Sequence, residues 1–117
     1  MTTPTKQSGA QLFVAFETSL EVIASLRDLV AVIRTRDLKL AQQIVASASS
    51  VAANLAEGNK RVGRDRVHFF RIASGSAAET RAHLRVAMAW GWLGPPDIET
   101  SLALLDRELA VLWRLTH

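Results

Sequence analysis

The side chains whose types and spacing could do chemistry stand out between positions 54 and 85, and seven of them are lysine or arginine. Four cations stand within the seven positions 60–66, where only Asp65 opposes them. Three more arginines follow at spacings that suit a helix. The candidate binding residues are Lys60, Arg61, Arg64, Arg66, Arg71, Arg81 and Arg85. Because a guanidinium group can donate two parallel hydrogen bonds to phosphate or carboxylate, the cluster predicts a surface for nucleic acid or an acidic protein partner.

The same cluster has a second interpretation, in which its arginines pair with carboxylates of this chain or of another subunit. Glu57 and Arg61 are one helical turn apart, which is the spacing of an ion pair on a helix surface. Asp65 and Glu79 are further possible partners. Charges on a solvated surface are ordinary in globular proteins, so the sequence leaves both interpretations open.

Residues that would support catalysis or hold a metal are few. The chain has no cysteine, and its three histidines stand at positions 68, 83 and 117. Glu79 and His83 are one turn apart and could share a metal, but a di-iron bundle needs Glu-x-x-His motifs, which the sequence lacks. Ser76 stands inside a predicted helix, without the strand-to-helix turn of a nucleophile elbow. We therefore expect no enzyme activity, no cofactor and no metal site.

Helical patterns fill the chain, and they determine where these residues lie. Apolar residues recur at steps of three and four, which places them on one face of a helix. The first such stripe joins Leu12, Phe16, Leu20, Ile23, Leu26, Val30 and Ile33. The pattern predicts helices over residues 11–34, 38–60, 64–92 and 97–115, after a flexible N-terminal segment at residues 1–10. Residues 11–117 would then form a single domain.

Turn residues separate the predicted helices. Asp37 is a candidate N-cap for the second helix, because its carboxylate can accept a free N–H group of the first turn. Gly58 suits a left-handed cap at the end of that helix, and Pro95 and Pro96 prevent the third helix from continuing. Such short connections force neighbouring helices to run antiparallel. The predicted fold is all-α: an antiparallel up-and-down four-helix bundle.

The third helix carries two apolar stripes, although packing within one bundle needs only one. The second stripe contains Phe69, Ile72, Ser76, Glu79, His83, Val86 and Trp90. It predicts a second neighbour outside the subunit and hence a homo-oligomer. Trp90, Trp92 and Trp113 could stack on nucleic-acid bases. Aromatic residues near helix ends more often fill a core or an interface, and we favour that role for them.

Composition limits the remaining classes of protein. The 117 residues carry a net charge of +3, and 49% of them are hydrophobic, which suffices for one core. No stretch has the roughly 18 uncharged apolar residues that a membrane span requires. The first ten residues lack the apolar run of a signal peptide. Together with the absence of cysteine, these features predict a soluble, cytoplasmic protein without membrane contact.

Residues 54–79 resemble a known family. They contain the segments Asn54-Leu55-Ala56-Glu57-Gly58 and Ile72-Ala73-Ser74-Gly75-Ser76-Ala77-Ala78-Glu79, with Arg61 and Phe70 between them. These segments are similar to those of the S23 ribosomal protein family, whose members are encoded in intervening sequences of ribosomal RNA genes. The accessory variability determinant of diversity-generating retroelements is similar too. The resemblance covers about residues 12–115. It departs from the pattern at Gly63, where relatives usually have serine, and the stretch up to Ile72 is one residue shorter.

The resemblance implies a four-helix bundle that assembles into a ring of five subunits and has no known catalytic activity. The retroelement relative binds a reverse transcriptase and nucleic acid through a basic surface. This implies RNA, DNA or a reverse transcriptase-like protein as possible partners. The residues themselves suggest structural roles for Asn54, Glu57, Gly58, Gly75, Ser76 and Glu79. We favour an oligomeric scaffold that binds through the basic cluster. The alternative is a purely structural assembly whose arginines make subunit contacts.

Overall fold

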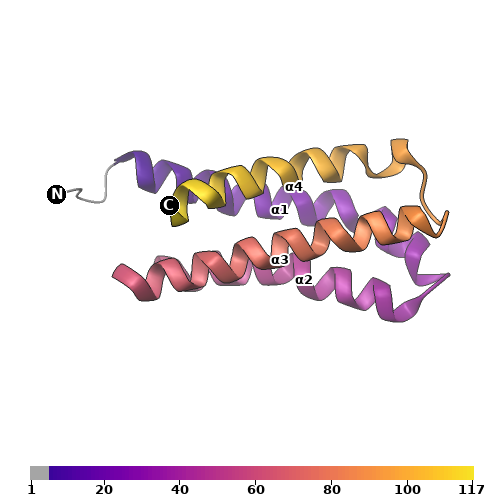
Figure 1. Ribbon diagram of the computed structural model, residues 1–117, viewed down its shortest axis with the longest axis horizontal. Coiled ribbons are helices and arrows are strands. Elements are labelled where there is room, and N and C mark those ends of the chain that lie inside the picture. Colours follow the sequence, from indigo (N-terminus) through magenta and orange to yellow (C-terminus); the bar gives the residue numbers. More distant parts are fainter. Residues whose placement is uncertain (1–5) are drawn as a thin grey trace.

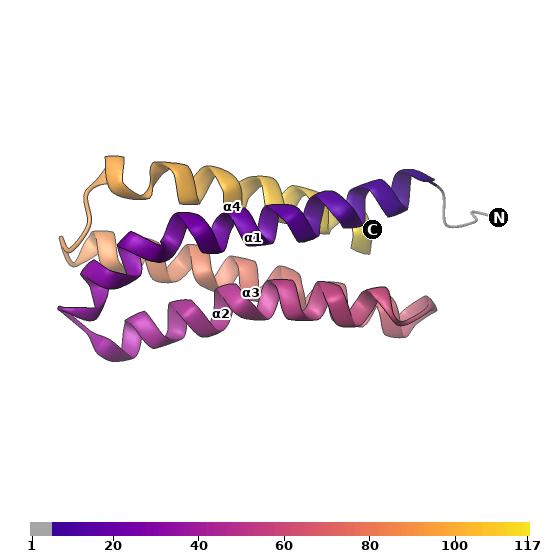
Figure 2. The same cartoon turned by 180° about the vertical axis from the view of Figure 1, so that it is seen from behind.

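The computed structural model describes residues 6–117, which form four helices joined by short connections. Helix α1 spans Lys6–Arg34, α2 Leu38–Asn59, α3 Gly63–Ala89 and α4 Pro95–Thr116. Each helix runs antiparallel to the next (Figures 1 and 2), and both α1 and α3 pack against α2 and α4. This arrangement confirms the predicted all-α, up-and-down four-helix bundle. None of these four described helices combines the length and the apolar composition needed to cross a membrane.

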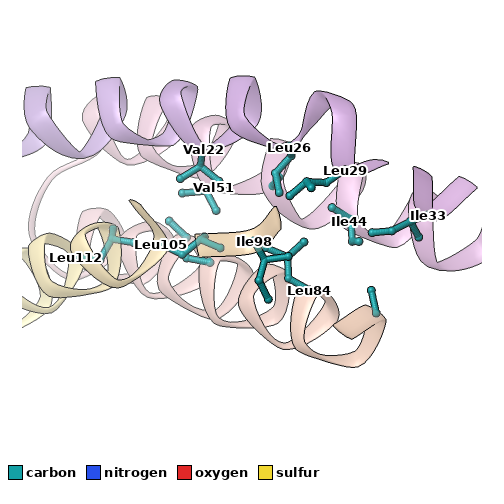
Figure 3. Packing of buried hydrophobic residues seen from close by; sticks show 14 of the residues in the cluster. Val22, Leu26, Leu29, Ile33, Ile44, Val51, Leu84, Ile98, Leu105 and Leu112 are labelled. Carbon is teal, nitrogen blue, oxygen red and sulfur yellow. The ribbon is translucent and has the colours of Figure 1, made fainter. Parts of the chain in front are cut away.

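All four helices contribute to one apolar core along the bundle axis (Figure 3). Leu26, Ile44, Leu84 and Leu105, one from each helix, are almost completely buried. Their side chains lie on the inner faces because apolar residues recur near the helical period of 3.6. The periodic pattern therefore accounts for the way in which the helices face one another.

The buried face of α1 differs from the predicted stripe. Leu20 is 43% exposed, whereas Thr18 and Ser19 are almost completely buried. The Ser19 hydroxyl donates to the carbonyl oxygen of Phe16 at 2.6 Å, which satisfies the polar group within its own helix. Apolar periodicity does not predict this face, because it contains small polar residues. Such a residue can lie in the core when its hydroxyl group is hydrogen-bonded to the backbone of its own helix.

The start of α1 and the end of α3 differ from their predicted positions. Helix α1 begins at Lys6 instead of residue 11, so residues 6–10, predicted as a flexible segment before the first helix, are helical. Residues 1–5 lie outside the described residues. Helix α3 ends at Ala89 instead of residue 92, because Gly91 turns the chain with φ +78°.

Side-chain caps fix the starts of α2 and α4. Asp37 accepts the backbone N–H of Leu40 at 3.0 Å, which confirms the predicted N-cap. Helix α4 begins at Pro95, two residues before the predicted start, because a proline in the first turn needs no partner for a backbone N–H. Asp97 accepts the backbone N–H of Gly94 at 2.7 Å and so caps the same turn.

Gly58 brings α2 and α3 into close contact. The predicted left-handed cap at this position is wrong, because among the described residues only Gly63 and Gly91 have positive φ. Gly58 is instead buried within α2. A Cβ atom at Gly58 would lie 2.6 Å from Cε1 of Phe70, far inside the roughly 3.5–4.0 Å contact distance of two carbon atoms. Only glycine therefore leaves room for the Phe70 ring.

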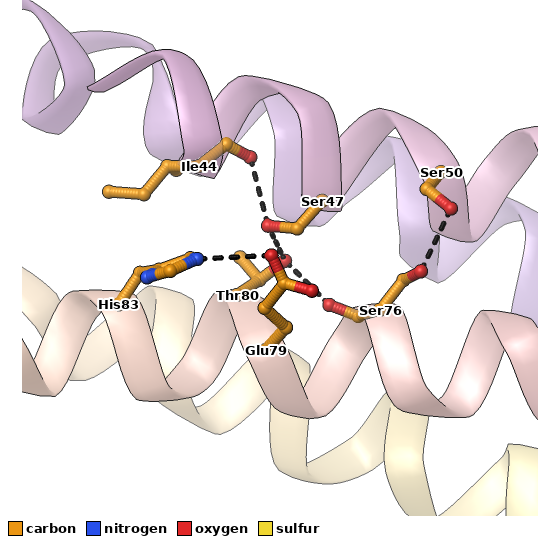
Figure 4. Close-up of polar contacts among 7 residues, drawn as sticks. All are labelled: Ile44, Ser47, Ser50, Ser76, Glu79, Thr80 and His83. Carbon is orange, nitrogen blue, oxygen red and sulfur yellow. Dashed lines mark hydrogen bonds and ion pairs between the residues drawn. The ribbon is translucent and has the colours of Figure 1, made fainter. Parts of the chain in front are cut away.

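Hydroxyl groups continue this contact along the line where α2 meets α3, here called the α2–α3 seam (Figure 4). Ser50 and Ser76 are hydrogen-bonded at 2.8 Å, and Ser47 and Thr80 at 2.7 Å. Thr80 also donates to the carbonyl oxygen of Ser76 at 2.9 Å. Because these hydroxyl groups have partners, burying them carries little penalty. The seam therefore has short polar side chains where a typical bundle has leucine.

Glu108 places a carboxyl group inside the core. Its side chain is completely buried, and neither carboxyl oxygen has a hydrogen-bond partner among the described residues. A narrow space beside it is lined by Ser19, Val22, Ala48, Val51 and Leu105. Burial raises the pKa of Glu108 to about 8, against an opposing attraction from Arg107. The carboxyl group is therefore mostly protonated at neutral pH.

The close contact at Gly58 predicts the effect of an added methyl group. We expect Gly58→Ala to lower the free energy of unfolding by roughly 1–3 kcal/mol, because the methyl group displaces the Phe70 ring. This range is the net effect: the steric strain itself is larger, and the higher helix propensity of alanine compensates about 1 kcal/mol of it. Gly75→Ala is the matched control, because a Cβ atom at this exposed position in α3 would meet nothing within 4 Å.

Urea unfolding at one protein concentration measures the stability of both variants and of the natural protein. Gly75→Ala should unfold at an equal or higher urea concentration than the natural protein. A Gly58→Ala protein as stable as the natural one would contradict the close contact.

The buried carboxyl group predicts a stability that falls as the pH rises. Glu108 keeps its proton in the folded chain up to a pKa of about 8, whereas the ordinary value in the unfolded chain is 4.5. Between these values the folded state binds more protons. The contribution of Glu108 to stability is therefore complete below the lower value and is lost as the pH rises through the upper one. We expect the natural protein to lose about 1.4 kcal/mol per pH unit relative to Glu108→Gln.

Urea unfolding of both proteins at several pH values between about 5 and 8 measures this difference. The titration of other groups cancels, because the two proteins share them. If the free energy of unfolding of the natural protein and of Glu108→Gln changed in parallel with pH, this would contradict a protonated carboxyl group without a hydrogen-bond partner in the core.

Candidate functional site

Five of the seven candidate binding residues surround the connection between α2 and α3. This connection contains only residues 60–62, because Gly63 adopts φ +60° and begins α3 at once. The start of α1 and the end of α4 lie at the same end of the bundle (Figures 1 and 2). We call this part of the molecule the basic end. The candidate cations of the basic end are Lys60, Arg61, Arg64, Arg66 and Arg71.

Arg61 is held within the chain by two carboxylates. Its Nε atom donates to Glu57 at 3.1 Å, and its Nη1 atom donates to Asp65 at 3.1 Å. Its guanidinium group also lies 5.2 Å from the centre of the Phe69 ring. The hydrogen bond that Arg61 donates to Glu57 and the charge of Asp65 raise the pKa of Arg61. Arg61 therefore links the end of α2 to the start of α3, and the predicted pairing with Glu57 is confirmed.

Arg81 is paired as well, and it lies away from the connection. Its Nε atom donates to Asp106 at 2.8 Å and so joins α3 to α4. Arg85 is exposed, but fourteen residues of helix place it roughly 21 Å from Arg71 along α3. The structure therefore does not bring Arg81 and Arg85 to the basic end.

The remaining cations of the basic end have no carboxylate within 4 Å in the part of the chain that the structure describes. They are Lys60, Arg64, Arg66 and Arg71. Lys60, Arg64 and Arg71 are exposed, whereas Arg66 is half-buried. The Arg66 guanidinium lies 5.3 Å from the centre of the Phe70 ring, an arrangement that attracts a cation to the ring face. These charges can therefore meet an external anion without first breaking an ion pair.

An apolar groove between α1 and α2 opens at the basic end. Its volume is about 450 Å³, and its walls are Gly9, Leu12, Phe13, Phe16, Leu55, Ala56, Asn59 and Lys60. Phe13 is 67% exposed. The sequence prediction missed this groove, although Phe13 gave a signal: it is a large apolar residue that falls outside the core stripe of α1.

Comparison with known proteins decides the family. A model of the family described as 23S rRNA-intervening sequence protein matches residues 14–113. The chain belongs to this family. The crystal structure of a protein of unknown function from the S23 ribosomal protein family of Bacteroides thetaiotaomicron is similar in fold, with a TM-score of 0.80 at 20% sequence identity. The similarity covers 87% of this chain and 97% of that one. No curated protein matches the chain.

The motif that suggested the intervening-sequence protein family acts mainly in the α2–α3 seam. The Asn54 side chain donates to the backbone oxygen of Ser50 at 2.9 Å and to its hydroxyl oxygen at 3.0 Å. The same hydroxyl bonds Ser76 of the second motif segment. With Gly58 against Phe70, these contacts fix the distance between α2 and α3. Asn54 and Ser76 therefore make structural contacts within the subunit, and Gly58 serves packing and not the predicted cap.

Two other motif residues lie on the outer surface. Gly75 is exposed and has open space around it, so the close packing predicted for it is wrong within the subunit. Glu79 is also exposed, and its carboxylate is hydrogen-bonded to Nε2 of His83 at 3.1 Å. Within residues 6–117, no three side chains of His, Asp or Glu come together as a possible metal site.

The tryptophans divide between the two ends of the bundle. Trp90 is 69% exposed and stacks on the partly buried Trp92, with 5.9 Å between the ring centres. Trp113 is 61% exposed and stacks on His117 at 4.5 Å. A core role is therefore wrong for Trp90 and Trp113, because both project from outer faces near helix ends.

Proposed function

We propose that this chain is a non-catalytic, oligomeric helical scaffold that binds the phosphate backbone of nucleic acid through its basic end. The observation that carries the proposal is the presence of three exposed cations, Lys60, Arg64 and Arg71, without an acidic partner in the described chain. Phosphate groups supply the negative charge that such a cluster lacks. A cytoplasmic location, expected from the cysteine-free composition, is part of the proposal.

The distribution of charge supports this assignment. Residues 57–71 contain five positive and two negative side chains, a net of +3, which equals the net charge of the whole chain. The rest of the sequence is therefore balanced. Arg61 contacts both carboxylates of the segment, and these three groups together carry a charge of −1. The other four cations carry +4, so the excess charge falls on them. A local excess of this kind attracts a polyanion more strongly than the same charge spread over the surface.

Self-association is the second part of the proposal. The outer face of α3 exposes Ile72, Val86 and Trp90 at 38%, 43% and 69%. Exposed apolar groups at helical spacing favour contact with another subunit. A ring of five, implied by the family resemblance, would present five basic ends to one nucleic acid and raise its affinity by multivalency. A solution mass near 12.8 kDa, the mass of one chain, would contradict this part.

The alternative is a purely structural assembly in which the free arginines contact a neighbouring subunit. The pairing of Arg61 and Arg81 within the chain favours it, because two of the seven candidate cations already have structural partners. An acidic protein, such as the reverse transcriptase-like partner implied by the resemblance, would use the same cations. Binding to nucleic acid distinguishes the leading proposal from both.

A salt series tests the proposal. We expect the natural protein to bind short labelled RNA or DNA with an affinity that falls as salt rises. Replacing Lys60, Arg64 and Arg71 by glutamine should weaken binding and reduce the slope of log affinity against log salt by about 2, because each lost contact with a single strand contributes about 0.7. Fluorescence anisotropy over several salt concentrations measures both quantities.

The matched control replaces Arg34, Arg36 and Lys39 by glutamine. These three exposed cations lie at the opposite end of the bundle, and their removal changes the net charge by the same amount. The control should keep the slope of the natural protein. If both variants lost affinity equally, binding would depend on the net charge alone and not on the basic end. If the natural protein bound no nucleic acid at low salt, the proposed binding of nucleic acid would be wrong.

A further inference from the structure

The groove between α1 and α2 at the basic end combines an apolar interior with a cationic rim. Leu12, Phe16 and Leu55 supply apolar walls, and Lys60 is itself a wall residue. Asn59 adds an amide that can both donate and accept hydrogen bonds. The ring of Phe13 is 67% exposed beside them. The ring and the apolar walls form one contiguous apolar surface with a polar rim, which is the kind of surface that marks a binding groove.

We propose that this groove receives an unpaired base of a single-stranded nucleic acid whose phosphates lie on the basic end. The inference rests on the proposed function and names the kind of nucleic acid that it concerns. A base would stack on Phe13, and Asn59 would bond its edge. Because Lys60 belongs both to the groove and to the basic end, the phosphate next to that base would lie beside the Lys60 ammonium group.

Size and charge favour this occupant. The volume of about 450 Å³ lies within the roughly 300–1,000 Å³ of pockets that hold small organic groups. Aromatic stacking beside a basic surface is the usual means by which proteins bind single strands without sequence readout. A paired base in a duplex stays stacked inside the helix and does not reach such a groove.

A second groove between the same helices lacks these features. It has a volume of about 340 Å³ and is lined by Ile23, Leu26, Arg27, Val30, Ile44, Val45, Ala48 and Ser49. It contains no aromatic residue, and Arg27 is its single cation. The combination of an exposed ring with the cation cluster therefore distinguishes the groove at the basic end from the other groove of the same helix pair.

The test compares one single strand and one duplex of the same length. We expect Phe13→Ala to weaken binding of the single strand about 5- to 100-fold, as for the loss of one stacked base, and to leave duplex binding within about twofold. Phe13→Trp should restore the affinity, because tryptophan presents an aromatic plane too. The matched control is Val32→Ala, which shortens another exposed apolar residue of α1, near its far end.

The outcomes separate the inference from the proposed function. If the natural protein binds both nucleic acids and Phe13→Ala binds them equally well, the groove holds no base, while the basic end keeps its function. If Phe13→Ala instead lowers the solution mass of the oligomer, the groove is a subunit contact and the inference is overturned. If the natural protein binds no nucleic acid, the proposed function and the inference fail together.

Discussion

The close approach of α2 to α3 at Gly58 is the constraint on which the basic end depends. The Phe70 ring occupies the space that any larger residue at Gly58 would fill. The paired hydroxyl groups of Ser50 and Ser76 hold the same two helices together one to two turns further along. With the helices fixed at this distance, a connection of three residues can join them. The cations that follow are then carried by a rigid helix and not by a mobile loop.

Arg61 has a different role from the other cations of the basic end. Its bonds to Glu57 and Asp65 span the connection and engage both nearby carboxylates. If these carboxylates were free, they would pair with Arg64 or Arg66 and reduce the local positive charge. One arginine therefore stabilises the connection, while the others remain available to an external anion. Charge-reversal of Arg61 would disturb the fold of the connection as well as its charge, so it is a poor probe of binding.

The fold could be predicted from the sequence because the positions of the helices follow from the periodicity of apolar residues. Apolar residues at helical spacing gave four helices, and the Asp37 cap followed from the chemistry of its side chain. Family membership was also predicted, because it rests on the short motif around Asn54 and Ser76, which the structure places in the seam.

Features that depend on contacts between helices were harder to predict. Gly58 resembled a cap because glycine often ends helices, whereas its actual role depends on a ring twelve residues later. Glu108 was not singled out, and nothing in the sequence marks it as buried without a hydrogen-bond partner among the described residues. The groove at Phe13 needs two helices to form its walls. Arg61 and Arg64 are alike in sequence, and only three-dimensional geometry shows that Arg61 is paired whereas Arg64 has no carboxylate partner among residues 6–117.

The central claim is that nucleic acid lies on the basic end, and crosslinking tests it most directly. The natural protein would be irradiated in complex with a uridine-rich single strand, and the crosslinked residues would be identified by mass spectrometry. The account predicts crosslinks within residues 60–71 of the α2–α3 connection and at Phe13 of α1. Crosslinks confined to the opposite end of the bundle, around residues 34–39 and Trp90, would contradict it.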